Sequence, residues 1–556
     1  MYLPMNRFKF KIIILFLLIK TVCYSTAINK SLEIKVTSNS MNCSVCRAHD
    51  SIELIKFFDA LNGANWIQKT NWKVAGQPIN TWYGITLNAN GCVSRIYFSR
   101  NNLKGKLYNF DFPELTFLSL TDNLLTGTIP NFDNLPQLET LELGTNQLTG
   151  NIPNFDKLPR LFRLHLDRNL LSGAVPNFNQ FPVLTSLRLS SNQLKGSLPI
   201  FDSLPLLNYL HLNQNQFTGA IPNFNLPVLN TLDLSSNQLN GSIPNFDNLQ
   251  LLSTLQLGLN QLTGNIPNFD NLLELSYLDL YTNKLSGIIP NFNKMTNLRV
   301  VILGNNEFTG NMPSFDKHTN LQELNIQINQ LTGSIPNFSE SPNLTKLILF
   351  SNKLSGSIPS FDATPELKQL YLFNNQLTGA IPNFDKLSSL QDLLLNNNLL
   401  SGCFSSSLKK FCRIRSNFSN NPQLPWLGDF SKFCKDSTQV GSPCNDMDST
   451  TVNDKIDKNC NCVGTSTTNI ELVINEGFDI YPNPTKDIIY IDLRQLNEKV
   501  NSIGIYNAKG NKIEDIKNVD QNSIIKYQCN ECMSDVYIIQ INTQNNSVTK
   551  KFVLMK

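Results

Sequence analysis

Histidines and aspartates are the residue types in this chain whose spacing could support metal binding or catalysis. The candidates are His49, His165, His211, His318, Asp233 and Asp279. His165 and His211 occupy equivalent positions two repeat units apart, as do the two aspartates. With strands about 4.8 Å apart, such side chains lie about 10 Å from each other, too far to share a zinc ion. This separation is at the edge of inverting-glycosidase geometry, but regular coils offer no pocket. We therefore predict no catalytic residue, no metal site and no enzymatic activity.

The composition and the charge distribution exclude several classes of protein. Charged residues are 16% of the 556-residue chain and hydrophobic residues are 41%, which argues against a disordered protein. Residues 1–27 match a secretory signal peptide, in which basic residues precede a short apolar run, Ile12 to Ile19, and a small-residue exit. Without this segment the chain is nearly neutral, which excludes a nucleic-acid partner. No later stretch is apolar enough for a transmembrane segment, so the mature chain is predicted to be secreted or held at the outer cell surface.

Eleven cysteines follow the signal peptide, and residues 93–402 contain none of them. An exported chain meets an oxidising compartment, so disulfides are expected, although the sequence does not determine their connectivity. The alternative is zinc bound by Cys43 and Cys46 or by Cys529 and Cys532, but neither pair has a second half at metal-ligand spacing. Disulfides are therefore the prediction.

Aspartates recur between Asp446 and Asp457, in a segment that also contains cysteines. Spaced aspartates can hold calcium, but the glycine and the bidentate glutamate of an EF-hand loop are missing here. We expect no cofactor. Residues 445–468 are predicted to be a polar linker pinned by disulfides, with bound calcium as the alternative.

A unit of 23 residues repeats along the cysteine-free stretch, with one step of 22. Its pattern is Leu138-x-x-Leu141-x-Leu143-x-x-Asn146-x-Leu148-x-Gly150-x-Ile152-Pro153. The Leu-x-Leu alternation predicts a short strand with its leucines directed inward. One unit cannot bury its apolar face alone, but a stack of units can. About 14 coils are expected between residues 92 and 405.

An asparagine and a phenylalanine recur once in most units. An inward asparagine at a bend can hydrogen-bond main-chain groups of its own and neighbouring coils, which would otherwise be buried without partners. We therefore predict a structural ladder of Asn146, Asn169, Asn192, Asn215, Asn237, Asn260, Asn283, Asn306, Asn329, Asn352, Asn375 and Asn398. The phenylalanines from Phe132 to Phe384 are expected to stack as a spine under the convex side.

The Leu-x-Gly-x-Ile-Pro ending of the unit resembles the plant-type subclass of leucine-rich repeat proteins. This resemblance covers residues 92–405 and implies an α/β-type repeat solenoid, a horseshoe dominated by short parallel strands. Residues 28–91 resemble the N-terminal cap of that family. They contain an expected helix over residues 50–62, with Ile52, Leu54, Ile55, Phe58 and Leu61 on one face, followed by Trp66, Trp72 and Trp82. We expect the tryptophans to pack on the first coil. Residues 406–444 are expected to be a cysteine-containing C-terminal cap.

Residues 469–556 combine short alternating strands with turn residues, which predicts a small β-sandwich. This segment resembles the type A C-terminal sorting domain of the type IX secretion system of Bacteroidetes. The resemblance lies in its start at Tyr481, Pro482, Asn483 and Pro484, an Ile-Tyr-Asn-Ala-Lys-Gly centre and a basic end. It implies that the type IX machinery is a partner and that the domain directs export across the outer membrane. The domain is often removed during such export.

The strand residues that point outward should line the concave face of the solenoid. They are polar and partly basic in the first half, and unusually apolar in the last coils. Exposed apolar patches usually mark interaction sites, unless the C-terminal cap covers them. The predicted ligand-binding residues are Tyr277, Tyr281, Ile302, Ile328, Ile348, Phe350, Tyr371, Phe373 and Leu394.

These patterns favour an exported, non-enzymatic recognition or adhesion protein that binds a protein or a glycan on its concave face. The alternative is a surface-coat protein that acts by self-association. A carbohydrate-active enzyme is the least favoured function.

Overall fold

The computed structural model describes residues 43–466, 478–483, 485, 488–494, 496, 498–507, 511–517, 519–520, 523–528, 535–544 and 547–554. The expected signal peptide, Pro484, Cys529 and Cys532 lie outside this part of the chain. The described residues form two compact units. The first runs to Cys444 and also includes residues 456–461, and the second contains residues 445–455 and the chain from Cys462 onward.

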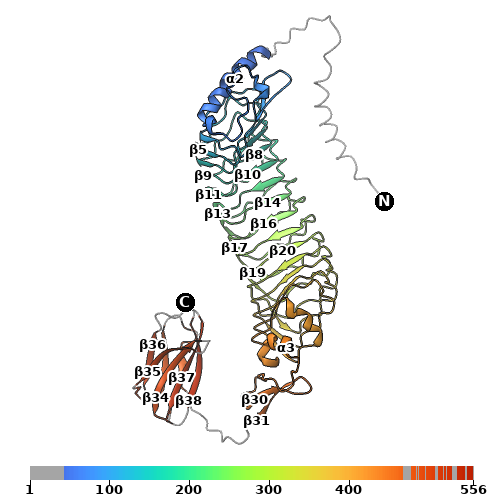
Figure 1. Ribbon diagram of the computed structural model, residues 1–556, viewed down its shortest axis with the longest axis vertical. Coiled ribbons are helices and arrows are strands. Elements are labelled where there is room, and N and C mark those ends of the chain that lie inside the picture. Colours follow the sequence, from blue (N-terminus) through green and yellow to red (C-terminus); the bar gives the residue numbers. More distant parts are fainter. Residues whose placement is uncertain are drawn as a thin grey trace, which may run out of the picture. The chain divides into compact units, whose positions relative to one another are not determined.

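The first unit is a stack of coils that each contribute one strand to a sheet of 16 strands (Figure 1). Apart from β1, which pairs antiparallel with β2, neighbouring strands are parallel and in register. In order, the strands are β1 (Ile85–Leu87), β2 (Val93–Tyr97), β4 (Phe117–Ser119), β6 (Thr140–Glu142), β8 (Arg163–His165), β10 (Ser186–Arg188), β12 (Tyr209–His211), β14 (Thr231–Asp233), β16 (Thr254–Gln256), β18 (Tyr277–Asp279), β20 (Val300–Ile302), β22 (Glu323–Asn325), β23 (Lys346–Ile348), β25 (Gln369–Tyr371), β27 (Asp392–Leu394) and β29 (Arg415–Asn417). The predicted repeat solenoid is confirmed.

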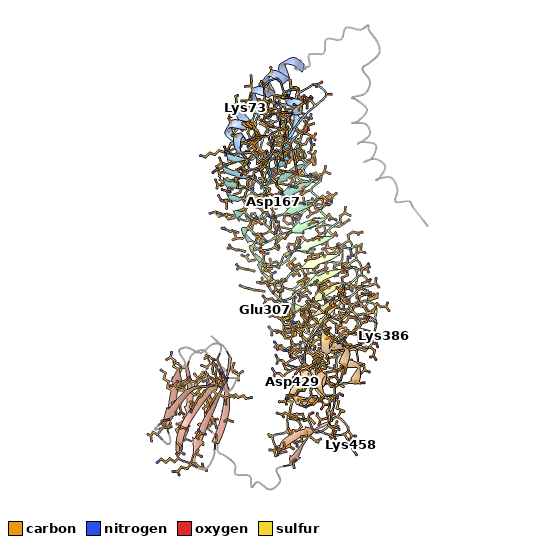
Figure 2. All side chains as sticks on the ribbon, viewed as in Figure 1. Lys73, Asp167, Glu307, Lys386, Asp429 and Lys458 are labelled. Carbon is orange, nitrogen blue, oxygen red and sulfur yellow. A yellow bond between two sulfur atoms is a disulfide. The ribbon has the colours of Figure 1, made fainter. Side chains whose placement is uncertain are left out.

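A second set of short parallel strands follows the asparagine of each coil. Ten of them form one sheet, and three more form another. The ten are β3 (Lys104–Lys106), β5 (Leu124–Thr128), β7 (Gln147–Gly150), β9 (Leu170–Gly173), β11 (Gln193–Gly196), β13 (Gln216–Gly219), β15 (Gln238–Gly241), β17 (Gln261–Gly264), β19 (Lys284–Ile288) and β21 (Glu307–Thr309). The three are β24 (Ser355–Gly356), β26 (Gln376–Gly379) and β28 (Leu399–Leu400). Asp167 lies just after β8, the first strand of its coil, whereas Glu307 begins β21 of this second set (Figure 2).

The interior of the stack repeats the same contacts in coil after coil. The inward leucines are fully buried, for example Leu141 and Leu143. Phenylalanine rings of successive coils stack, with centroids 6.5 Å apart for Phe132 and Phe155. The side-chain amide of Asn146 donates to the carbonyls of Leu120 and Leu143, at 3.0 and 3.1 Å, and its oxygen accepts the N–H of Leu125 at 3.0 Å. The asparagine therefore pairs main-chain groups of three segments at once.

The N-terminal cap packs a helix and three tryptophans on the first coil. Its elements are α2 (Cys43–Ala60), η1 (Gly63–Asn65) and η2 (Ile79–Thr81). Trp66, Trp72 and Trp82 are buried, and the Trp66 ring lies 4.8 Å from that of Phe98 on the first coil. The packing role of the tryptophans is therefore confirmed.

The expected buried face of the cap helix is partly wrong. Leu54, Phe58 and Leu61 are buried as expected, but Phe57 is buried as well, and Ile52 and Ile55 are 59% and 39% exposed. The helix buries positions 54, 57, 58 and 61, which follow the three-and-four spacing of one helix face. Ile52 falls off that face.

The C-terminal cap consists of η3 (Ser406–Arg413), β29, η4 (Pro425–Gly428) and α3 (Phe430–Lys435). It contributes a further coil that the sequence pattern did not indicate, because Ser416 stands where each repeat has an inward leucine. Asn421 extends the asparagine ladder by donating to the carbonyls of Leu395 and Phe418.

Both cysteines are identified for three disulfides in the described part of the chain. Cys46 bonds to Cys92 in the N-terminal cap, Cys412 to Cys434 in the C-terminal cap, and Cys403 at the end of the repeats to Cys460. Cys444 and Cys462 are disulfide-bonded too. Because Cys46 is in a disulfide, its sulfur is not available as a zinc ligand.

The second unit contains a two-stranded sheet, β30 (Thr451–Ile456) and β31 (Cys462–Ser466), and two antiparallel sheets. One sheet has the order β32 (Asp479–Tyr481), β33 (Ile488–Asp492), β36 (Ile524–Gln528), and the other has the order β35 (Lys512–Lys517), β34 (Val500–Asn507), β37 (Asp535–Thr543), β38 (Ser547–Leu554). Buried side chains of both sheets, such as Ile489, Ile505 and Ile539, form one core. The predicted β-sandwich is therefore present.

Candidate binding surface

The outward side chains of the 16-stranded sheet form the concave face. Because the parallel strands are in register, equivalent positions of successive coils line up in rows across the sheet. One row through the C-terminal half contains Ile302, Asn325, Ile348, Tyr371 and Leu394. Five successive coils thus contribute to one continuous row of uncharged side chains.

Two aromatic rings stack beside this row. Phe350 follows β23 and Phe373 follows β25, and their ring centroids are 4.2 Å apart with planes only 10° from parallel. Both side chains are half-buried. Each ring therefore covers one face of the other.

Tyr371 is held in place by polar neighbours. Its hydroxyl donates to a carboxylate oxygen of Asp392 at 2.7 Å, and the same oxygen accepts from the amide of Gln369 at 3.0 Å. The guanidinium of Arg415 lies 6.0 Å from the Tyr371 ring centroid. Burial and the Asp392 carboxylate raise the pKa of Tyr371. The tyrosine ring is thus fixed and remains a neutral hydrogen-bond donor.

The predicted binding residues differ in how far their side chains are exposed to solvent. Ile348 and Leu394, which lie on either side of Tyr371 in the row, are only 9% and 8% exposed. Ile328 is 42% exposed, in a left-handed backbone conformation. Tyr277, Tyr281 and Ile302 are half-buried. Ile328 is therefore the most exposed of the predicted residues, whereas Ile348 and Leu394 contribute little accessible surface.

The N-terminal half of the concave face is charged. One row contains Glu142, His165, Arg188, His211 and Asp233, with the arginine between the two histidines. The Arg188 side chain is exposed. The row therefore alternates in sign from one end to the other, unlike the apolar row of the later coils.

Both histidines in this row are neutral at physiological pH. Burial, together with the positive charges of Arg188 and Arg163 and the nearby His211, lowers the pKa of His165 to about 3. Burial also lowers the pKa of His211, with Arg188 adding to the effect. His165 lies 2.8 Å from the hydroxyl of Ser186. The histidines thus act as hydrogen-bonding groups and leave Arg188 as the cation of the row.

Asp233 and Asp279 are used within their own coils. Asp233 accepts from the main chain and hydroxyl of Ser235, at 3.0 and 2.7 Å, and Asp279 accepts from the N–H of Tyr281 at 2.9 Å. Gln256 separates them in the row. Burial raises the pKa of Asp279, although the Tyr281 N–H opposes this. The two carboxylates do not face one another across a cavity.

The aspartates of the linker are engaged in turns. Asp446 accepts from the hydroxyl of Thr451 at 2.9 Å and from the N–H of Gly464 at 3.1 Å, and Asp454 accepts from the N–H of Asp446 at 3.0 Å. Among the described residues, no group of three or more histidine, cysteine and acidic side chains could hold a metal ion. The absence of a cofactor stays a prediction, with calcium in this segment as the alternative.

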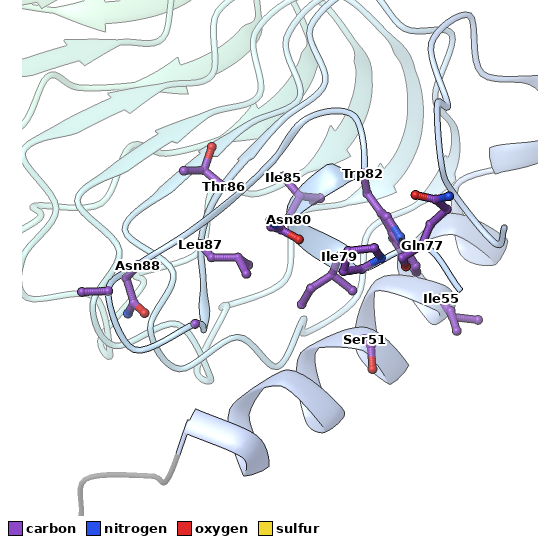
Figure 3. Close-up of a pocket in the computed structure, with 13 residues that line it drawn as sticks. Ser51, Ile55, Gln77, Ile79, Asn80, Trp82, Ile85, Thr86, Leu87 and Asn88 are labelled. Carbon is purple, nitrogen blue, oxygen red and sulfur yellow. Dashed lines mark hydrogen bonds between the residues drawn. The ribbon is translucent and has the colours of Figure 1, made fainter. Parts of the chain in front are cut away.

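A groove of about 880 Å³ opens at the N-terminal cap, which the sequence did not suggest. Ser51 and Ile55 of α2 face Ile79, Trp82 and Leu87 across it (Figure 3). It borders β1, the last strand at this end of the sheet. In the sequence, the groove is indicated by Ile55, one of the two isoleucines of α2 that lie outside the core.

The sorting motif joins the beginning of the β-sandwich to its last strand. The side chain of Asn483 donates to the carbonyl of Lys551 at 3.0 Å and accepts the N–H of Val553 at 2.9 Å. The rings of Tyr481 and Tyr490 stack at 5.9 Å. Asn483 therefore fastens the motif to β38.

Comparisons with known proteins agree with this architecture. The family described as Secretion system C-terminal sorting domain matches residues 479–555, and the family described as Leucine Rich Repeat matches residues 228–249. None of the curated proteins matches the chain. No helix in the described ranges is long and apolar enough to cross a membrane.

Several solved plant structures resemble the solenoid. The ectodomain of the Arabidopsis receptor kinase HAESA, in complex with an extended IDA peptide hormone, is 30% identical with a TM-score of 0.61, and the match covers 68% of this chain and 69% of that one. The GASSHO1/SCHENGEN3 ectodomain from Arabidopsis thaliana, in complex with CASPARIAN STRIP INTEGRITY FACTOR 2, is 28% identical with a TM-score of 0.60. That match covers 68% of this chain, which spans 52% of the receptor structure.

The chain belongs to the leucine-rich repeat proteins. It carries a type IX secretion system sorting domain, which directs it to the cell surface or the medium.

Proposed function

We propose that this exported protein recognises a protein ligand through the C-terminal half of its concave face. The observation that carries the proposal is the stacked pair of Phe350 and Phe373 beside the fixed ring of Tyr371. Half-buried aromatic residues, held rigidly and surrounded by polar groups, are the typical anchors of protein interfaces. The protein acts by recognition or adhesion rather than by catalysis.

The orientation of the rings favours a protein over a glycan. Because the planes of Phe350 and Phe373 are 10° apart and their centroids 4.2 Å apart, each ring hides a face against the other. A sugar ring binds best over an exposed aromatic face. The stacked rings, together with half-buried aliphatic side chains of the same face such as Ile302, instead suit the apolar and aromatic side chains of a polypeptide.

The related receptor structures support a polypeptide ligand. The HAESA ectodomain was solved with a peptide hormone, and its fold covers 68% of this chain. The type IX export machinery would be the second partner, through the sorting domain. The matching of this domain also supports a Bacteroidetes origin, in which the cargo is released or kept on the surface after export.

The test is a binding measurement with the secreted chain immobilised. Extracellular and cell-surface proteins form one set of probes, and a glycan panel forms the other. We expect a saturable protein interaction that weakens at least about 30-fold in Phe373→Asp, as expected for an interface anchor worth about 2 kcal/mol.

The matched control is Thr218→Asp, which places the same charge on an exposed position of β13 in the second strand set. It should bind like the parent. If the chain bound members of the glycan panel and none of the proteins, the ligand would be a sugar and not a protein. Equal weakening by both substitutions, or none by Phe373→Asp, would overturn the assignment of the site.

A further inference from the structure

Exposed apolar side chains form a stripe along one side of the coil stack, outside the concave face. Val183, Leu206, Leu251 and Leu273 are 39%, 47%, 49% and 52% exposed. The first two and Leu251 each directly precede a buried inward leucine, as does the half-buried Val228. We refer to Val183, Leu206, Val228 and Leu251 as the lateral stripe.

The stripe is confined to four successive coils. At the equivalent position, the coils before it have Glu114, Gln137 and Arg160, and the coils after it have Glu274 and then asparagines. Exposed prolines precede Val183, Leu206 and Val228 and widen the apolar area. The restriction to adjacent coils makes one contiguous patch, which is typical of an interaction surface.

The residues at the two ends of the stripe carry opposite charges. Arg160 lies in the coil before Val183, and Glu274 lies in the coil after Leu251. Both are exposed, and neither joins any of the ion pairs made within the described ranges. Glu274 accepts only a long bond from Asn297, at 3.5 Å.

This pattern is complementary to itself under a two-fold rotation. A two-fold axis that lies in the plane of the contact and crosses the stripe at right angles between Leu206 and Val228 brings Val183 of one copy against Leu251 of the other. The same rotation exchanges Arg160 with Glu274. An interface between two identical copies requires this property, because one patch must serve both sides. A stripe with the same charge at both ends would repel its own copy.

We propose that the lateral stripe is the contact of a two-fold symmetric dimer of this chain. In this dimer the apolar side chains meet in the centre, and Arg160 of each copy pairs with the partner subunit's Glu274. The contact uses none of the concave residues, so it is independent of the proposed ligand site and leaves that face free.

Sedimentation velocity of the mature chain over a range of concentrations tests the proposal. We expect the parent to dimerise and Leu206→Asp to remain monomeric at the same concentrations. Because Leu206 is 47% exposed, this substitution should leave the circular dichroism spectrum unchanged. The melting temperature should also be unchanged when both proteins are diluted below the dimer dissociation constant of the parent. A parent that stays monomeric throughout, or a dimer that survives Leu206→Asp, would overturn the proposal.

Charge reversal tests the symmetry itself. Arg160→Glu and Glu274→Arg should each raise the dimer dissociation constant about tenfold, because each places two like-charged pairs at the rim. An equimolar mixture of the two variants should recover the parent affinity, since both rim pairs again have opposite charges. The control, Lys386→Glu on another part of the stack, should behave as the parent. Failure of the mixture to recover affinity would show that the copies do not meet in this way.

Discussion

The interior of the coil stack and its concave face are built on the same strands but follow opposite rules. Inward positions repeat almost without change, so that Asn146 and Asn352, nine coils apart, make the same three hydrogen bonds. Outward positions range from Arg188 to Phe350 on identical backbones. This difference shows that the need to pair buried main-chain groups determines the residue type at inward positions. Outward positions have no such constraint, so their residues can vary with the ligand that is recognised.

Removal of one ladder asparagine is the strongest test of the rule that buried main-chain groups fix the inward residues. In Asn260→Ala the carbonyls of Leu234 and Leu257 and the N–H of Leu239 lose their partners. Three buried groups left unpaired should lower the free energy of unfolding by about 3 kcal/mol or more. Urea denaturation followed by circular dichroism measures the change.

The neighbouring residue supplies the control. Gln261 is exposed on β17, so Gln261→Ala should change the free energy of unfolding by less than about 0.5 kcal/mol. Similar losses for the two variants would show that the ladder is not what stabilises the coil.

His165 tests the difference between inward and outward positions in a different way, because its side chain points outward and is nevertheless largely buried. Its pKa is about 3 in the folded chain, below the ordinary value of 6.5. The unfolded chain therefore binds the proton more tightly between these values, and folding stability falls as the pH drops below about 6.5. Between pH 7 and pH 5 the loss should be roughly 2 kcal/mol. His165→Gln, measured by denaturation at both pH values, should reduce this pH dependence by that amount, and an unchanged dependence would contradict the assignment.

The smallest stability effect is expected at the aromatic pair. Phe373→Ala removes one half-buried ring from the stack and should cost only about 1 kcal/mol in thermal unfolding. The same substitution should strongly weaken ligand binding. A loss of stability as large as that of Asn260→Ala would instead make Phe373 part of the core and remove it from the recognition surface.

The repeats were predictable because their period is regular and each position has one physical role. Fourteen coils, the inward asparagines and the phenylalanine spine all follow from the 23-residue spacing. The coil that contains Asn421 was missed because Ser416 replaces the inward leucine that defines the pattern. The sandwich was predicted through its alternating strands and its YPNP start.

Details that depend on neighbouring side chains could not be predicted from spacing. Ile348 and Leu394 are buried although they stand at outward positions, and such burial depends on the side chains of adjacent coils. The partners Cys46 and Cys92 are distant in sequence, and only the packing of α2 on the first coil brings them together. The lateral stripe was visible in the sequence, as apolar residues before the inward leucine of four successive units, but its exposure was not.

The disulfides of the two caps have a consequence for the survival of the protein outside the cell. A linear stack unravels from its terminal coils, where each repeat has only one neighbour to hold it. Here Cys46–Cys92 closes one end, and Cys412–Cys434 closes the other. Fraying is therefore opposed covalently at the two places where it would begin. Extracellular proteases, which cut chains that open locally, would find few terminal coils to attack.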